Sequence, residues 1–158
     1  MEKKKVVIIG SGPAGYTAGV YAARAVLEPT LFAGIKSGGQ VMWTSDVENF
    51  PGVPDGIGGP QLMMQMRSQA EKFGAQIQDQ FVTAVDFSQR PFKIWTNFPE
   101  GQSYETVEFS KNDALVQFTE QVKQSSEHAI EADSVIIAAG ATAILLGVPG
   151  EREFMGKG

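Results

Sequence analysis

The first third of the chain alternates between uninterrupted apolar stretches and a segment with helical periodicity. Lys4 to Ile9 is rich in β-branched residues, which is typical of a parallel strand that is buried on both faces. Pro29 to Ala33 is a second apolar stretch and predicts the neighbouring parallel strand. Between them we expect a helix that begins at Pro13, because a first helical turn tolerates proline, and ends near Val26. These elements predict a right-handed β-α-β unit.

Apolar positions on two predicted helices indicate which faces are buried. The second helix is expected to begin at Pro60 and to end before Gly74, with Met63 and Met66 in the core and Arg67 on its polar face. The segment from Gly34 to Pro60 shows neither helical nor strand periodicity, and its length is typical of a functional loop. On the first helix, the predicted sheet-facing stripe comprises Ala14, Ala18, Tyr21, Ala22 and Ala25.

Several short strands are predicted in the remainder of the chain. Gln76 to Ile77, Val82 to Phe87 and Phe92 to Thr96 indicate a small antiparallel β-meander, because a turn with proline joins the last two. Ser134 to Ala138 predicts another buried strand of the parallel sheet. The expected fold class is therefore α/β with three layers: a parallel sheet, helices on one face and the meander on the other.

Residues 97–128, here called the acidic segment, differ from the rest in composition. They include six acidic and two basic residues, and we predict a polar hairpin inserted into the domain. Such an insertion is either a solvated surface or a docking surface for a partner.

Length and composition narrow the functional class. A chain of 158 residues suits one domain, and a net charge of -5 disfavours a nucleic-acid partner. The apolar stretches are too short to cross a membrane, and the amino terminus has no signal-peptide core, so we expect a cytoplasmic protein. The chain contains no cysteine, so redox chemistry would require a bound cofactor. No catalytic residue and no metal site is predicted.

The turn after the first strand carries the spacing of a dinucleotide-binding fingerprint. Gly10 suits a tight turn, Gly12 lets the main chain approach a pyrophosphate, and Gly15 allows close contact between helix and strand. The context of strand, turn and helix is what makes this pattern specific. The acidic residue expected at the end of the second strand is absent, because Ala33 stands there and Glu28 precedes the strand. This feature therefore leaves NAD and FAD both open.

Five segments carry a more specific resemblance. In chain order they read GSGPAGYTAGVYAARA, GGQ followed by TSDVENFPG, GPQLMMQMRSQAEKFGA, VDFSQRPFKIWT and VIIAAGATA. They resemble the amino-terminal, FAD-binding half of the low-molecular-weight, NADPH-dependent thioredoxin reductases. The resemblance covers Lys4 to Thr96 and Ala129 to Gly158, and it implies a Rossmann-like FAD/NAD(P)-binding fold.

The resemblance implies FAD as the cofactor and a position for each part of it. The glycine turn would hold the pyrophosphate, and Ala33 to Gln40 would follow the ribityl chain and flavin. Gln40 and Asn49 would contact the flavin, whose mixed polar edge suits their amides, and Val82 would meet the adenine. The implied cofactor-binding residues are Gly10, Ser11, Gly12, Pro13, Ala14, Gly15, Ala33, Gly38, Gly39, Gln40, Asn49, Val82 and Gly140.

The resemblance also implies an activity, thioredoxin-disulfide reduction. Hydride would pass from NADPH to FAD, and electrons would then reach a dithiol that reduces thioredoxin. We expect residues 1–158 to be a partial FAD-binding domain that lacks the family's final segment and its nicotinamide domain, so the chain alone should retain FAD weakly or not at all and should not turn over. The complete protein would have thioredoxin as its partner and no nucleic-acid or membrane partner, and it could form a homodimer.

Two departures from the family pattern leave alternatives open. Ala139 stands where family members generally have threonine, and the acidic segment is longer than the usual connection. The alternatives are a related flavoprotein with another electron donor and a non-catalytic nucleotide-binding or docking module.

Overall fold

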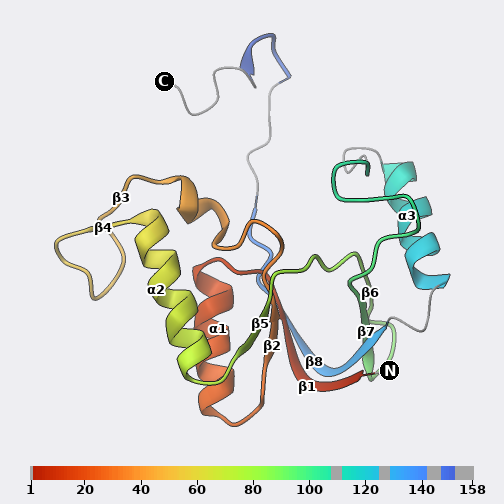
Figure 1. Cartoon of the computed structure of the whole chain (residues 1–158), viewed down its shortest axis with the longest axis horizontal. Helices are drawn as coiled ribbons and strands as arrows, with labels where there is room; N and C mark the ends of the chain where they lie inside the picture. The colour runs from red at the N-terminus through yellow and green to blue at the C-terminus, as the bar shows by residue number, and fades with distance from the viewer. Residues whose placement is uncertain (1, 108–111, 125–128, 142–146, 152–158) are drawn as a thin grey trace.

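The structure is a computed structural model that describes residues 2–107, 112–124, 129–141 and 147–151. Its main feature is a six-stranded sheet in the order β5-β2-β1-β8-β7-β6 (Figure 1). Strands β5, β2, β1 and β8 are parallel, whereas β7 and β6 are each antiparallel to the preceding strand in that order. The sheet strands are β1 (Glu2–Ile9), β2 (Thr30–Phe32), β5 (Gln76–Gln78), β6 (Ala84–Asp86), β7 (Phe92–Trp95) and β8 (Ile130–Ile137).

The remaining elements are mostly helices. The predicted β-α-β unit is confirmed, since α1 connects the parallel strands β1 and β2. Among the described residues, no helix is long and apolar enough to cross a membrane. The elements outside the main sheet are α1 (Pro13–Arg24), the 3-10 helix η1 (Gly39–Trp43), β3 (Asp46–Val47), β4 (Ile57–Gly58), α2 (Gly59–Lys72) and α3 (Asn112–Gln124).

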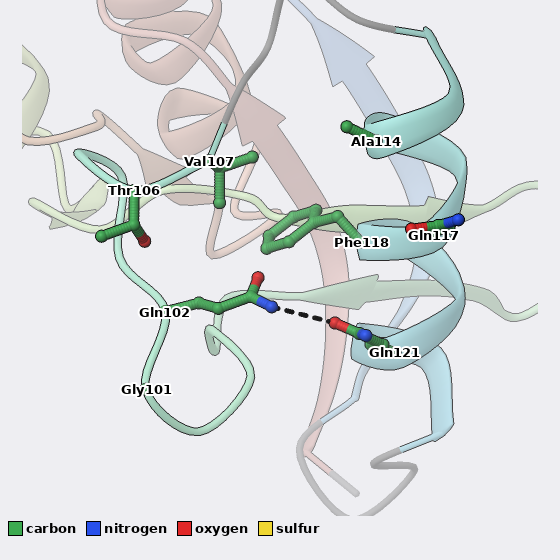
Figure 2. A pocket seen from close by; sticks show the side chains of 8 residues that line it. All are labelled: Gly101, Gln102, Thr106, Val107, Ala114, Gln117, Phe118 and Gln121. Atoms are coloured by element: carbon green, nitrogen blue, oxygen red, sulfur yellow. Dashed lines mark hydrogen bonds between the residues drawn. The ribbon is translucent and has the colours of Figure 1, made fainter.

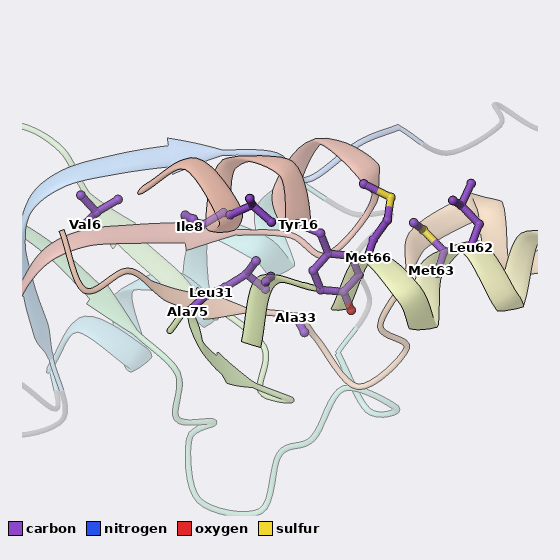
Figure 3. Packing of buried hydrophobic residues seen from close by; sticks show 11 residues of the cluster. Val6, Ile8, Tyr16, Leu31, Ala33, Leu62, Met63, Met66 and Ala75 are labelled. Carbon is purple, nitrogen blue, oxygen red and sulfur yellow. The ribbon is translucent and has the colours of Figure 1, made fainter. Parts of the chain in front are cut away.

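Helices α1 and α2 cover one face of the parallel strands. Figure 3 shows the cluster between them, in which Ile8 and Leu31 of the sheet lie with Tyr16 of α1 and with Met63 and Met66 of α2. Both methionines are buried, which confirms the prediction that they belong to the core. Methionine suits this irregular space because its side chain is unbranched and flexible.

The buried face of α1 differs from the predicted stripe. Gly15, Tyr16, Gly19 and Val20 are buried, whereas Tyr21, which the stripe placed against the sheet, is 65% exposed. The prediction is confirmed for Ala22, which is buried, and was wrong for Ala14, Tyr21 and Ala25, which are exposed, because it weighted alanine above glycine. The helix face that lacks side chains is the one that can approach the sheet most closely, so the glycines mark the contact.

The antiparallel strands cover the opposite face of the parallel sheet. Val7 of β1 and Phe32 of β2 point away from the helices and pack with Ile94 of β7 and Ala132 of β8. This contact confirms the predicted three layers. It also explains why β1 is apolar at successive positions, since Val7 and its neighbour Ile8 are both fully buried, on opposite faces.

β8 is longer and less buried than predicted. It begins at Ile130, and its last residue, Ile137, is 65% exposed. β8 belongs to both parts of the sheet, because β1 pairs along its length while β7 pairs only with Ile130 to Ala132. Among the described residues, no strand pairs with the part of β8 that follows Ala132 on the side where β7 lies. This missing neighbour accounts for the exposure of Ile137.

The acidic segment does not form the predicted hairpin. Part of it is α3, whose Phe118 and Val122 pack with Ala84 of β6 and Trp95 of β7. Phe118 and Val122 are four positions apart, a helical spacing that the high acidic content obscured. Residues 108–111 and 125–128 of this segment lie outside the described residues.

Arg67 connects α2 to the loops that follow β2 and β5. Its guanidinium donates to both carboxylate oxygens of Asp79 at 2.7 and 2.9 Å, to Glu71 at 3.0 Å and to the Ser37 hydroxyl at 3.3 Å. The hydrogen bonds from Arg67 lower the pKa of Asp79, and Asp79 in turn raises the pKa of Arg67. The residue predicted to lie on a polar helix face is therefore an anchor for two loops.

The contact between the two layers of strands can be tested at Ile94. Because Ile94 is fully buried against Val7 and Phe32, Ile94→Ala should lower the free energy of unfolding by about 2–5 kcal/mol. Urea denaturation measures this change. Ile35→Ala is the control, since Ile35 is 65% exposed and should shift stability by less than about 0.5 kcal/mol. Equal effects in the two variants would contradict the assigned packing.

The pair of Arg67 and Asp79 predicts a pH dependence of stability. A pKa lowered on folding stabilises the protein above the ordinary value of 3.8, and this contribution is lost as the pH falls through the lowered value. Asp79→Asn should therefore be less stable than the parent by about 1 kcal/mol at pH 7, a small figure because the pair is partly exposed. The difference should shrink below about pH 4.

Thermal or urea unfolding at several pH values measures the difference. Asp55→Asn, which changes an exposed carboxylate in the loop between β3 and β4, serves as the control for loss of one negative charge. A stability difference for Asp79→Asn that grew in acid would show that the pair does not act as described.

Candidate nucleotide-binding site

The parallel strands end together at one edge of the sheet. In the register of the strands, Ile9 of β1 lies beside Phe32 of β2 and Ile137 of β8. The segments that follow them are consequently neighbours, which the backbone bonds from Gly10 N to Phe32 O and from Ala138 N to Ile9 O confirm. After β1 the chain continues to β2 on one side of β1, whereas β8 lies on the other side of β1. In α/β sheets, ligands bind at the carboxyl ends of the strands where the strand order reverses in this way.

Two of the three fingerprint glycines are required by the fold. Gly10 has a φ of 113°, and a Cβ on it would lie 2.1 Å from the Ala138 carbonyl oxygen. A Cβ on Gly15 would lie 2.0 Å from the Gly10 carbonyl oxygen. The backbones at the end of β1, the start of α1 and the end of β8 are in direct contact, so neither Gly10 nor Gly15 has room for a side chain.

Gly12 is different, because the packing of the described residues does not require it. Its φ is −72°, and a Cβ on it would meet nothing within 4 Å. Gly12 is the N-cap of α1, so the open space beside it lies at the helix N-terminus. The first turn of α1 has no acidic residue, and no capping side chain accepts a hydrogen bond from it. Unpaired N–H groups and the positive end of the helix dipole favour an anion there.

Ser11 holds the two loops of the site together. Its buried hydroxyl donates to the Ala33 carbonyl oxygen at 2.8 Å and accepts from the Gly38 N–H at 3.0 Å. Because these bonds occupy the Ser11 hydroxyl within the protein, its contribution to a phosphate would come from the backbone. Gly39 lies close by, since a Cβ on it would stand 3.4 Å from the Gly12 Cα.

Gln40 and Gly140 also lie at this edge. The Gln40 amide nitrogen donates to the Ala141 carbonyl oxygen, which links η1 to the segment after β8. Gly140 has a φ of 71° and open space on the side where a Cβ would stand. The structure thus brings together most of the predicted site residues, namely Gly10, Ser11, Gly12, Pro13, Ala14, Gly15, Ala33, Gly38, Gly39, Gln40 and Gly140.

Asn49 and Val82 lie farther from the glycine turn. Asn49 is exposed in the loop between β3 and β4, which extends beyond α2 and away from β8 (Figure 1). Val82 follows β5 and is half-buried in the layer formed by the antiparallel strands. The segment before it is fixed by the bond from Gly34 N to the Gln80 carbonyl oxygen at 3.1 Å. The cofactor contacts of Asn49 and Val82, like those of the other predicted site residues, stay predictions.

The sequence patterns missed two contributors to this edge. One is Arg67, whose bond to Ser37 orients the segment before Gly38. The other is Phe81, whose ring lies 3.5 Å from the position of a Cβ on Gly34 and stacks on Tyr104 of the acidic segment. Neither has a periodic signal, because both depend on contacts between segments far apart in the chain. No group of side chains suited to a metal ion occurs among the described residues.

Comparison with known proteins agrees with this geometry. A family model described as pyridine nucleotide-disulphide oxidoreductase matches residues 4–158. A thioredoxin reductase of Rickettsia bellii is 46% identical over 154 residues, which make up 98% of this chain and 41% of the relative. A thioredoxin reductase of Dictyostelium discoideum is 44% identical over 160 residues, or 98% of this chain and 42% of the relative.

A solved structure shows the same fold. The thioredoxin reductase from Giardia duodenalis matches with a TM-score of 0.71 at 37% identity, and the match covers 100% of this chain and 42% of that one. The chain thus spans about two fifths of the length of the relatives that it matches. Because the family model matches nearly the whole sequence, the chain belongs to the pyridine nucleotide-disulphide oxidoreductase family, membership of which implies flavin binding.

Proposed function

We propose that this chain is the FAD-binding region of a thioredoxin-disulfide reductase. The observation that carries the proposal is the open side of Gly12 at the N-terminus of α1. The close packing of β1, α1 and β8 requires glycine at positions 10 and 15, whereas no packing contact requires glycine at position 12. A ligand whose phosphates approach the main chain would explain the glycine at position 12. The similarity to relatives named thioredoxin reductase supports FAD as this ligand.

The chain's own residues would bind and orient the dinucleotide. The backbone of Ser11 to Ala14 and the helix N-terminus would hold the pyrophosphate, which carries the negative charge. Gly38 and Gly39 let the main chain come close to a flat ring, and the Gln40 and Asn49 amides would hydrogen-bond its polar edge. When bound, FAD supplies the hydride and electron transfer chemistry. The side chains of Arg67 and Ser11 act indirectly, because they hold the loops in place.

The activity of the complete protein is part of this proposal. It would use NADPH as the reductant and the disulfide of thioredoxin as the substrate. The net charge of -5 argues against a nucleic-acid partner, and we propose a cytosolic protein that acts as a homodimer. This chain contains no cysteine, so it holds no dithiol through which electrons could pass to a protein disulfide.

Substitution of the fingerprint glycines tests the nucleotide site. Gly12→Ala should fold with a free energy of unfolding within about 1 kcal/mol of the parent, since the added methyl group meets no protein atom. It should weaken FAD binding at least about tenfold, because the methyl group occupies space needed by the pyrophosphate. Titration with FAD, followed by flavin fluorescence, measures the affinity.

Gly15→Ala is the matched variant in which the same methyl group has a different effect. Its Cβ would lie 2.0 Å from a backbone oxygen, so this variant should lose the cooperative unfolding transition as well as FAD binding. Unaltered FAD affinity in a folded Gly12→Ala variant would rule out the assignment of the pyrophosphate to this turn.

Because the chain contains no dithiol, we expect it to bind FAD without catalysing the reduction of a disulfide. The purified chain should bind FAD weakly and show no NADPH-dependent reduction of thioredoxin or of an aromatic disulfide, as followed by the absorbance of NADPH. A complete thioredoxin reductase is the positive control for the assay. Sustained turnover by the 158-residue chain would show that electrons leave the flavin by a route that needs no cysteine.

A further inference from the structure

The end of β2 carries no acidic side chain, and the nearby Asp79 carboxylate is bound by Arg67. In dinucleotide-binding folds of this topology, an acidic residue near the end of the second strand binds a ribose hydroxyl. Here β2 ends at Phe32 and is followed by Ala33 and Gly34, which offer no side-chain acceptor. A side chain that contacts the adenosine would therefore come from another segment, and one such segment lies beside Gly34.

The segment beside Gly34 is aromatic. A Cβ on Gly34 would lie 3.5 Å from Phe81 Cε1, and the backbone bond from Gly34 N to Gln80 O keeps Phe81 in that place. The rings of Phe81 and Tyr104 are stacked, with centroids 4.5 Å apart and planes 13° from parallel. Phe81, Val82, Thr83, Phe98, Tyr104 and Phe118 line an apolar cavity of about 250 Å³.

Tyr104 is held there by the acidic segment. It stands in a turn closed by the bonds from Thr106 N to Ser103 O at 3.1 Å and from Ser103 N to Thr106 Oγ1 at 2.8 Å. Gln102 ties this turn to α3, since its amide donates to Gln121 Oε1 at 3.0 Å (Figure 2). The edge-to-face contact of Phe81 with Phe98 and the contact of Phe98 with Phe118 extend the aromatic packing from Gly34 to α3.

We propose that Phe81 and Tyr104 form the aromatic surface that stacks with the adenine ring of the bound dinucleotide, in place of the missing carboxylate. Aromatic rings suit this role because every base has a π-face, and stacking excludes water from both partners. Tyr104 is 43% exposed, so the pair still presents ring surface to a ligand. The acidic segment therefore contributes to binding of the cofactor rather than to solubility alone. This inference rests on the proposed FAD site and assigns its adenine end.

Tyr104→Ala tests the inference through the affinities of two probes. FAD and ADP both carry the adenine and the pyrophosphate, and ADP is measured by its competition with FAD. The variant should bind both probes about tenfold more weakly, by the same factor, whereas Tyr104→Phe should bind both as the parent does. Phe87→Ala is the control for loss of an aromatic ring, because Phe87 packs with Phe92 on the turn between β6 and β7.

The outcomes separate this inference from the proposed function. Failure of the parent chain to bind FAD would overturn the proposed function. If the parent binds FAD, then three results would overturn the adenine surface alone: no competition by ADP, weaker binding of FAD without weaker binding of ADP, or unchanged or tighter binding of both probes by Tyr104→Ala. The last result would mean that Tyr104 covers the site instead of completing it.

Discussion

The close crossing of β1, α1 and β8 is the constraint on which the rest of the molecule depends. Side chains are excluded at Gly10 and Gly15, because a Cβ at either position would lie about 2 Å from a backbone oxygen. This contact sets the distance between the helix and the sheet, and therefore the direction in which the N-terminus of α1 points. A side chain at the crossing would move the helix N-terminus, which is the part of the fold that attracts an anion.

The loops of the site depend on this crossing through a few polar contacts. Ser11 lies between the two glycines and bonds the end of β2 to Gly38. Arg67 bonds the preceding residue, Ser37, and through Asp79 it bonds the loop after β5. Each hydrogen bond contributes modestly to stability, but a buried hydroxyl left without partners would be costly, so these contacts favour one arrangement of the loops.

The acidic segment is part of the packed domain rather than a separate polar extension. Its charged residues predicted a solvated hairpin, yet α3 packs Phe118 and Val122 on the antiparallel strands. The same segment delivers Tyr104 to Phe81, beside the end of β2. The acidic segment therefore lies next to the edge where the cofactor is proposed to bind.

The sequence by itself determined the elements whose signals are local. The β-branched strand, the proline and glycines around it and the methionine helix identify the β-α-β unit, the three layers and the glycine turn, because period and backbone freedom are properties of adjacent residues. The sequence also identified most of the residues that lie at the carboxyl ends of the parallel strands, including Gly10, Gln40 and Gly140. Only the tertiary structure decided which face of α1 is buried, that α3 is a helix on the sheet, and that Arg67, Phe81 and Tyr104 meet the site loops. Those outcomes depend on contacts between distant segments, and neither local period nor composition encodes such contacts.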